Sequence, residues 1–218
     1  MKILMLRIFF VLVNIMLVSN YIYSQKRVDC EANTKIRLTT ICLPSLKGQK
    51  LISNDFDYKD FIEKFTYQGN EIIGFYINRD KPEYEYVSVF VNSKYKQDVN
   101  TALFKKMYSS VGFSIRKTDD LELIIKNIED NYLENISLDR PTLVDSYSLN
   151  SKLKTCILLG KKIELDNEII TISTLNLMHL KGKIVLSNYL IKYENSNSIN
   201  ELKQKNDYFL MRIFNANN

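Results

Sequence analysis

The last fifty residues, 168–218, constrain the fold more than any other part of the chain. Residues 168–180 and 183–193 are dense in β-branched and aliphatic side chains, and Lys181-Gly182 separates the two runs. A short connection that contains glycine, placed between two runs of this kind, is typical of a β-hairpin. We therefore expect a long hairpin near the C-terminus.

A helix is expected directly after this hairpin. Ser198 and Glu201 have the spacing of a capping box, in which each side chain satisfies exposed amides at the start of a helix. The apolar residues that follow recur at helical spacing, and they are Ile199, Leu202, Phe209, Ile213 and Phe214. One face of the helix should therefore pack on the hairpin.

The first 24 residues have the pattern of a secretory signal peptide. Lys2 and Arg7 provide a positive start, residues 8–18 are apolar except for one asparagine, and Ser24 makes a tolerable cleavage site before residue 25. The alternative is an uncleaved membrane anchor, but this apolar run is shorter than the roughly 20 residues that span a bilayer. We expect residues 1–24 to be removed and residues 25–218 to form one domain, because a chain of 218 residues with 45% hydrophobic and 25% charged side chains has ordinary globular composition.

The charge of the mature chain gives no reason to expect a nucleic-acid partner. Without Lys2 and Arg7 the chain has 28 basic and 25 acidic residues, a net charge of +3. The lysines are interspersed with acidic residues, whereas proteins that bind nucleic acid usually concentrate basic residues on one face. We expect no nucleic acid partner, and no span of the membrane after cleavage.

Cys30, Cys42 and Cys156 all lie in the mature part, and an exported protein can form one disulfide from them. Cys42 and Cys156 fall in expected strands and could bond if those strands are neighbours, while Cys30 falls in an expected flexible start. The alternative is that Cys42 and Cys156 are buried free thiols. The sequence does not decide the pairing.

Between the signal peptide and the C-terminal hairpin, we expect short runs of strands to alternate with runs of helices. We expect strands at Ile36–Leu43, Glu71–Asn78, Tyr84–Val91 and Lys154–Ile163, helices at Asp57–Phe65, Val99–Ser110 and Asp119–Asn135, and a connection at Asn135–Leu153. Strands that follow one another in runs argue for an α+β fold with a mainly antiparallel sheet rather than for βαβ repeats.

The chain resembles the PsbP/Mog-like family at both ends. The resemblance is carried by the hairpin with its Lys181-Gly182 turn that leads into residues 198–217, and by the strand end Ile41-Cys42-Leu43-Pro44. It implies a layered α/β/α sandwich with a C-terminal helix packed on the central sheet, and a non-catalytic role. Members of the family act by binding a larger partner, such as a photosystem or a small GTPase, but no binding residue can be carried over to this chain.

The sequence contains few candidates for catalysis or metal binding. His179 lies in an expected strand near a turn, where a surface or sheet-edge position is the more ordinary role, and Cys42, Cys156 or Ser173 would have to serve as its nucleophile. Glu83 and Glu85 share one strand face and could suit glycosidase-like chemistry, although a solvated face also explains them.

An aspartate cluster at residues 55–60 suggests a calcium loop, but Lys59 occupies a ligand position of that template and no glycine follows it. Capping of the following helix by Asp57 and Asp60 is the simpler interpretation. We therefore assign no catalytic, cofactor-binding or metal-ligating residue, and expect no cofactor.

These observations together favour an exported, non-enzymatic binding or accessory protein of the bacterial envelope, periplasmic or secreted, with a protein as its partner. The working surface would be the exposed sheet face or the connection at Asn135–Leu153. The alternatives are an exported hydrolase that uses acidic residues and a periplasmic immunity protein. Carboxylates concentrated in one deep pocket would favour the hydrolase, while a shallow surface would favour the binding protein. The sequence does not reveal the ligand or the oligomeric state.

The signal-peptide interpretation predicts the mass of the mature protein. When the full chain is expressed in a bacterium with an active secretory pathway, the purified protein should begin at Gln25, because Ser24 precedes the expected cleavage site. Intact-mass measurement of the envelope fraction checks this. A protein that keeps residues 1–24 would instead support the anchor.

Overall fold

The computed structural model describes residues 29–66, 69–110, 121–130, 138, 141–164 and 167–218. The expected signal peptide and parts of the expected helix at residues 119–135 lie outside these residues.

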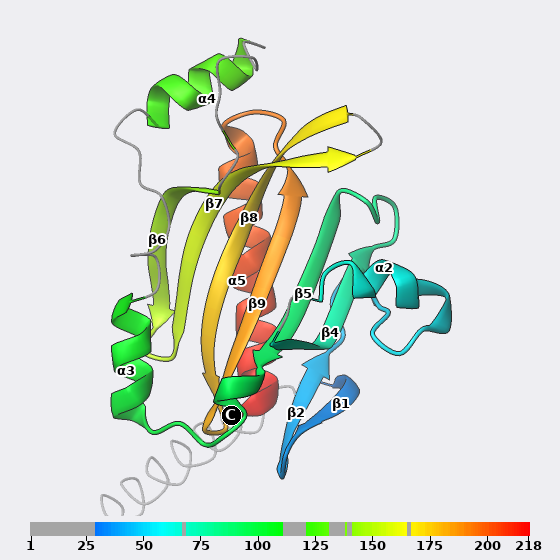
Figure 1. Cartoon of the computed structure of the whole chain (residues 1–218), viewed down its shortest axis with the longest axis vertical. Coiled ribbons are helices and arrows are strands. Elements are labelled where there is room, and N and C mark those ends of the chain that lie inside the picture. Colours follow the sequence, from blue (N-terminus) through cyan, green and yellow to red (C-terminus); the bar gives the residue numbers. More distant parts are fainter. Residues whose placement is uncertain (1–28, 67–68, 111–120, 131–137, 139–140, 165–166) are drawn as a thin grey trace, which may run out of the picture.

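A seven-stranded antiparallel sheet forms the centre of the molecule (Figure 1). Its spatial order is β3-β4-β5-β9-β8-β7-β6. The strands are β3 (Gln49–Leu51), β4 (Asn70–Asn78), β5 (Glu85–Asn92), β6 (Thr142–Asn150), β7 (Leu153–Glu164), β8 (Asn167–Leu180) and β9 (Lys183–Lys192). Each neighbouring pair is antiparallel. The expected strands at residues 71–78, 84–91, 154–163 and the C-terminal hairpin are confirmed.

The β8–β9 hairpin has the tight turn that the sequence predicts. Leu180 pairs with Lys183, so Lys181 and Gly182 form a two-residue loop, and both have positive φ angles of 48° and 79°. Two successive left-handed residues match the right-handed twist of the flanking strands, and glycine adopts this conformation without steric cost. The turn fixes the register of β8 and β9 in the interior of the sheet.

One face of the sheet is covered by α5 (Asn197–Asn217), which runs behind the strands in Figure 1. Leu202, Phe209, Leu210 and Ile213 are buried there against residues of β5, β7, β8 and β9. This confirms the expected packing of the C-terminal helix on the hairpin. Burial of side chains of this size contributes roughly 1.5–3 kcal/mol each, so the apolar stripe of α5 is a main source of stability.

Shorter helices cover parts of the opposite face, which gives the expected α/β/α layers. Phe61 and Phe65, in and just after α2 (Lys59–Glu63), pack on Phe75 and Tyr86. Phe104 of α3 (Thr101–Ser110) packs against β8 and β9. The remaining helical segments are η1 (Phe56–Tyr58), η2 (Ser93–Tyr95) and α4 (Leu121–Glu129). No helix among the described residues is both long and apolar enough to cross a membrane.

A buried polar network joins α5 to the sheet. Asn206 of α5 and Asn176 of β8 are fully buried, and the Asn176 Nδ2 group donates to Asn206 Oδ1 at 2.8 Å. Thr174 Oγ1 donates to the same oxygen at 2.9 Å, and Thr155 Oγ1 donates to Asn176 Oδ1 at 2.8 Å. Because buried amides are stable only when their hydrogen bonds are made, this network fixes one position of the helix on the sheet.

The N-terminal part of the described chain is a separate hairpin of β1 (Cys30–Ile36) and β2 (Thr39–Pro44). It places Cys30 beside Cys42, and the two form a disulfide with a Cα–Cα distance of 5.3 Å. The Cys42–Cys156 bond, which the sequence left open, is therefore not formed. Cys156 lies on β7 in the other sheet as a buried free thiol, and its burial raises the pKa of that thiol. Cys30 is not in a flexible start, because β1 pairs with β2.

The C-terminal end of α5 holds the outer edge of β2. Asn217 accepts a hydrogen bond from the Cys42 backbone N–H and donates one to the Cys42 carbonyl, both at 2.8 Å. The buried amide of Asn217 thus takes the place of a neighbouring strand. Arg212 adds a hydrogen bond to the carbonyl of Ser45 at 3.1 Å. These contacts attach the small hairpin to the main body of the fold.

Three local expectations were wrong. The capping box does not form, because α5 begins at Asn197 and Ser198 Oγ instead accepts from the backbone N–H groups of Glu194 and Asn195. The expected connection at residues 135–153 contains an edge strand, β6, with two register shifts that interrupt its pairing. Asp55, not Asp57 or Asp60, caps the first helical turn, where its side chain accepts from the Asp57 N–H.

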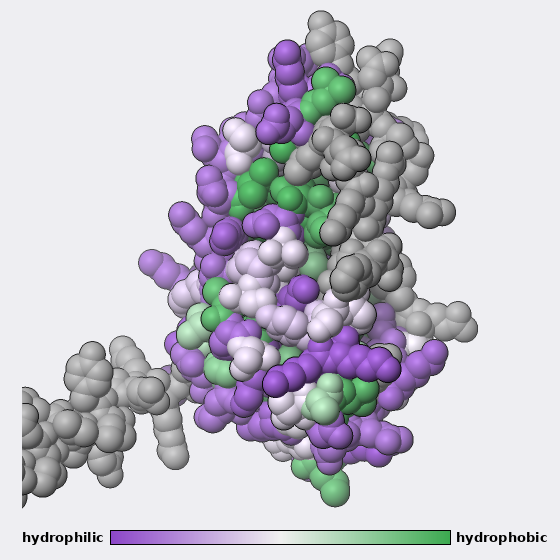
Figure 2. All heavy atoms as spheres, turned by 90° about the vertical axis from the view of Figure 1, so that its left-hand side faces the viewer, coloured by the Kyte–Doolittle hydropathy of each residue, from purple (hydrophilic) through white to green (hydrophobic). Residues whose placement is uncertain are grey.

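The exposed edge strand β6 lies on the side of the molecule that Figure 2 shows. Hydrophilic and neutral side chains cover much of this side, and apolar side chains gather mainly in its upper half. Bulges are a common means of preventing edge-to-edge association, and β6 has two register shifts of this kind.

The contacts of Asn217 predict a strong effect for one C-terminal substitution. Asn217→Ala should lower the free energy of unfolding by about 2–3 kcal/mol, because it leaves a buried N–H and a buried carbonyl of Cys42 without partners. Chemical denaturation measures the change. Asn218→Ala is the matched control, since Asn218 is exposed and bonds only within its own helix, and it should change stability by less than about 0.5 kcal/mol. Equal effects of the two substitutions would refute the proposed role of Asn217.

Candidate functional site

A cavity of about 390 Å³ lies on the sheet face that α5 does not cover, and we call it the sheet-face cavity. It occupies the strip between the part of this face under α2 and the part under α3. Its lining comes from five strands, β4, β5, β7, β8 and β9, from the residue Phe65 just after α2, and from residues 138 and 141 before β6. The lining residues are Phe65, Asn70, Ile72, Tyr86, Ser88, Phe90, Leu138, Pro141, Gly160, Lys161, Lys162, Thr171, Ser173, Leu175, Asn188 and Leu190. The volume falls within the range of small-molecule sites.

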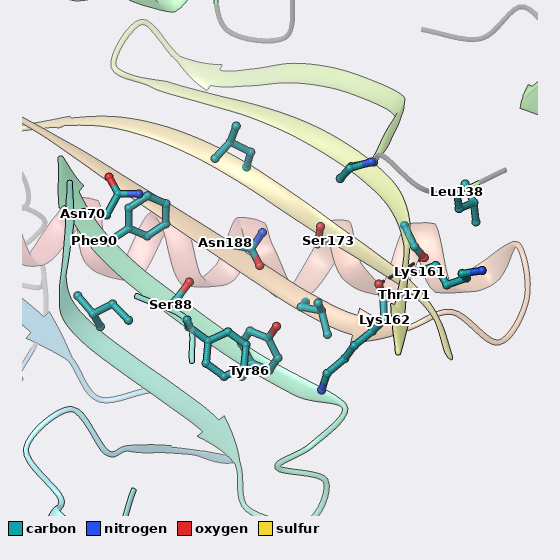
Figure 3. A pocket seen from close by; sticks show the side chains of 16 residues that line it. Asn70, Tyr86, Ser88, Phe90, Leu138, Lys161, Lys162, Thr171, Ser173 and Asn188 are labelled. Carbon is teal, nitrogen blue, oxygen red and sulfur yellow. Dashed lines mark hydrogen bonds between the residues drawn. The ribbon is translucent and has the colours of Figure 1, made fainter. Parts of the chain in front are cut away.

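Polar side chains mark the middle of the cavity floor. Ser88 of β5 is directly opposite Asn188 of β9, and Asn188 is opposite Leu175 of β8. Ser173 lies two residues before Leu175 and therefore on the same face. Figure 3 shows Ser88, Asn188 and Ser173 on three neighbouring strands beneath the cavity. The sequence thus places three small polar groups where a strand interior is otherwise apolar.

Aromatic and aliphatic side chains form most of the remaining lining. The rings of Phe65 and Tyr86 are 4.9 Å apart, and Tyr86 stacks on Phe75 at 5.4 Å. Phe90 borders the floor on the opposite side of Ser88 along β5. An apolar lining with a few placed polar groups is the usual composition of a ligand pocket.

Two lysines lie at one end of the cavity, and the described lining contains no carboxylate. Lys161 forms an ion pair with Glu168 at 2.5 Å. The Lys162 ammonium donates to the backbone carbonyl of Glu83 at 3.4 Å. The lining residues therefore carry positive charge at one end only.

The two glutamates expected on one solvated strand face differ in burial, although both line a second cavity of about 310 Å³ together with Glu194 and Glu201. Glu83 is exposed, whereas Glu85 is only 6% exposed and lies on the α5 side of the sheet. Its carboxylate accepts four hydrogen bonds, which come from Gln49 Nε2 at 3.1 Å, Tyr189 OH at 2.9 Å, Asn78 Nδ2 at 2.8 Å and Lys205 Nζ at 2.8 Å. Glu85 thus anchors α5 to the sheet through Lys205.

The neighbours of Glu85 are held in the protonation states that this network needs. Burial, together with the nearby Glu85 carboxylate, raises the pKa of Tyr189 far above its usual value, so the phenol remains a donor. Burial lowers the pKa of Lys205, but hydrogen bonds to Glu201 and Glu85 outweigh that effect, and the net shift is upward. Lys205 stays charged and links Glu85 to Glu201.

His179 is not the surface residue that the sequence analysis expects. It is half-buried, its Nε2 atom lies 3.0 Å from the Val99 carbonyl oxygen, and its ring stacks on Phe104 at 4.9 Å. Ser173 is six residues away along β8, roughly 20 Å, which is too far for a nucleophile. Cys156 pairs with Leu175, so it lies roughly 13 Å along the strand from His179. His179 therefore connects the segment before α3 to the sheet.

The aspartates at residues 55–60 are used locally. Asp55 bonds to Lys50 at 2.9 Å, and this hydrogen bond keeps the pKa of Asp55 below its usual value. Among the described residues, no group of three His, Cys, Asp or Glu side chains is placed to hold a metal ion.

Sequence reasoning missed the sheet-face cavity, although it named the exposed sheet face as a working surface. Ser88 and Asn188 stand between apolar neighbours in otherwise hydrophobic strands, and that interruption is the signal that could have identified them. Their pairing across β5 and β9 depends on a contact between strands nearly one hundred residues apart in sequence, which local patterns do not reveal.

Comparison with known proteins does not identify a family for this chain. No protein-family model and no curated protein matches the sequence. Among solved structures, it is similar to the Saccharomyces cerevisiae Ran-binding protein Mog1p, with 14% identity, a TM-score of 0.35, and coverage of 84% of this chain and 92% of the other. A mutant of the protein Mog1 gives the same identity and TM-score, with 84% and 93% coverage. Likeness at this level carries no conclusion about function.

The Glu85 network predicts a large cost for removing its cation. Lys205→Met should lower the free energy of unfolding by about 2–3 kcal/mol, because it leaves a buried carboxylate without its ion pair. Lys203→Met on the same helix is the control and should cost less than about 1 kcal/mol, since Lys203 contacts only the ring of Tyr147 among its described neighbours. Urea denaturation compares the two. Adding Glu85→Gln to Lys205→Met should recover part of the loss, and a Lys205→Met protein as stable as wild type would contradict the role of this pair.

Proposed function

We propose that the protein is an exported, non-enzymatic binding protein whose binding site is the sheet-face cavity. The observation that carries the proposal is the lining of the cavity, which combines apolar walls with a few uncharged polar groups and two lysines, and which contains no described carboxylate. Apolar walls with a few placed polar groups are the usual means of holding and orienting a ligand.

A hydrolase that uses acidic residues is less well supported. Such chemistry needs carboxyl groups that face the substrate, usually in pairs about 5–10 Å apart. The buried Glu85 has its acceptor positions occupied by four donors, and Glu83 is exposed on the surface. Neither glutamate lines the sheet-face cavity.

We also propose a place among PsbP/Mog-like proteins, and export to the bacterial periplasm or beyond. The support for the family is the order of elements, in which a hairpin with a Lys181-Gly182 turn leads into a C-terminal helix packed on an antiparallel sheet. The support for export is the pattern of residues 1–24. If the partner is a protein, it would bind the same open face. One such partner is a toxin, in which case this chain would be the immunity protein that neutralises it.

The proposal is tested by filling the cavity. Gly160 lines it, and a Cβ atom added there would meet only Thr171 Oγ1, at 4.0 Å, so Gly160→Leu should occupy the cavity without disturbing the strand. Gln204→Leu adds the same side chain at an exposed position of α5 and is the control. Residues 25–218 of each protein are incubated with envelope extract and analysed by native mass spectrometry.

The wild type and Gln204→Leu should retain the same added mass, and Gly160→Leu should lose it. Retention by all three proteins would place the binding site elsewhere. Release of a chemically altered molecule on each cycle of binding would instead identify an enzyme. An added mass equal to that of a whole protein would identify a protein partner.

A further inference from the structure

The polar groups at the middle of the cavity floor lack partners in the described part of the chain. Ser88 is only 8% exposed, and Asn188 and Ser173 are half-buried, yet none of the three side chains makes a hydrogen bond to another described residue. Polar groups at the ends of the cavity do have partners, since Asn70 accepts from Asn92 at 2.9 Å and Thr171 donates to the Gly160 carbonyl at 3.4 Å. Because buried polar groups are normally paired, the middle of the floor is suited to a ligand that supplies the missing bonds.

The chemistry of these groups describes the ligand atoms that would meet them. A serine hydroxyl and an asparagine amide each donate and accept, and neither is charged. Ser88 and Asn188 face each other across β5 and β9, so one ligand group can reach both. Along β5 and β9 the floor becomes apolar on both sides of this pair, at Phe90 in one direction and at Tyr86 and Leu190 in the other. On β8, Leu175 lies directly beside Asn188, and Ser173 lies beside Leu190.

The position of the floor within the sheet argues against an extended peptide. Ser88, Asn188 and Ser173 lie on β5, β9 and β8, and each of these strands is paired on both sides. Their backbone groups are used in the sheet, so an added strand has no edge to bind here. A small molecule that lies across the side chains meets no such restriction.

We infer that the sheet-face cavity binds an elongated, uncharged, mainly aliphatic molecule with one internal hydrogen-bonding group, such as an ester, which is held by Ser88 and Asn188. This inference rests on the proposed binding function. An anionic headgroup at the lysine end is the competing possibility. Lys161 is already paired with Glu168, so its charge is offset locally.

Three probes of similar length separate these possibilities. Pentyl pentanoate has an internal ester, undecane is its apolar counterpart, and decanoate has an anionic end. Each is used to displace the uncharged fluorescent dye N-phenyl-1-naphthylamine from residues 25–218. Pentyl pentanoate should bind about tenfold more tightly than undecane, as expected for one additional hydrogen bond of ordinary strength.

Two substitutions locate the effect. Asn188→Leu keeps the approximate size of the side chain and removes its polar atoms, so it should abolish the preference for the ester while undecane still binds. Asn54→Leu makes the same change at an exposed position outside the cavity, and it should leave the preference unchanged. Thermal denaturation of both variants confirms that they fold.

Each remaining outcome overturns a defined part of the inference. Equal binding of the ester and the alkane would show that the cavity does not recognise the polar group, although it still binds small molecules. If decanoate binds most tightly and Lys162→Ala weakens its binding, the ligand is anionic and the inference of a neutral ligand is wrong. Failure of the dye and of every probe to bind the wild type would refute the cavity as a site for small molecules, and with it the proposed function in this form.

Discussion

The hydrogen bonds between Asn176 and Asn206 set the geometry on which the rest of the structure depends. The two amides are buried between α5 and the sheet, together with Thr155, Thr174 and Ser187. An apolar interface alone would tolerate small shifts of the helix, but a shift here would break several buried hydrogen bonds at once. The helix is therefore fixed in both position and rotation. Glu85 and Lys205 add a second fixed point along the same helix.

Because α5 covers one face of the sheet, the sheet-face cavity lies on the other. The helices on that side are short, and they cover its margins through Phe61 and Phe104. The strip between them keeps uncharged polar residues at positions that a closed core would fill with aliphatic ones. The α5 side of the sheet is held rigidly, and the cavity lies on the other side. Such a site is formed before the ligand binds, so binding carries no entropic cost for ordering the sheet.

The sequence predicted the elements that show a clear local pattern of apolar residues and that lie in the interior of the sheet. The alternation in residues 84–91 and the runs around Lys181-Gly182 belong to central strands, and the structure confirms them. Residues 142–150 were not recognised as a strand, because an edge strand can remain polar on much of its surface. The capping box does not form, because Ser198 Oγ accepts hydrogen bonds from the backbone N–H groups of Glu194 and Asn195 instead. The disulfide was missed because the β1–β2 hairpin that brings its cysteines together was not recognised. The burial of Glu85 and the cavity floor depend on long-range contacts, which no local pattern contains.

The bond between Asn217 and β2 also governs when the fold can be completed. Cys42 and Asn217 are separated by 175 residues, so the edge of β2 receives these two hydrogen bonds from a distant part of the chain. The disulfide of the N-terminal hairpin joins residues only 12 positions apart, whereas the attachment of this hairpin to the main body needs the distant helix α5. Contacts this distant in sequence are slow to form. The small hairpin is therefore expected to take its final position late in folding, after α5 has packed on the sheet.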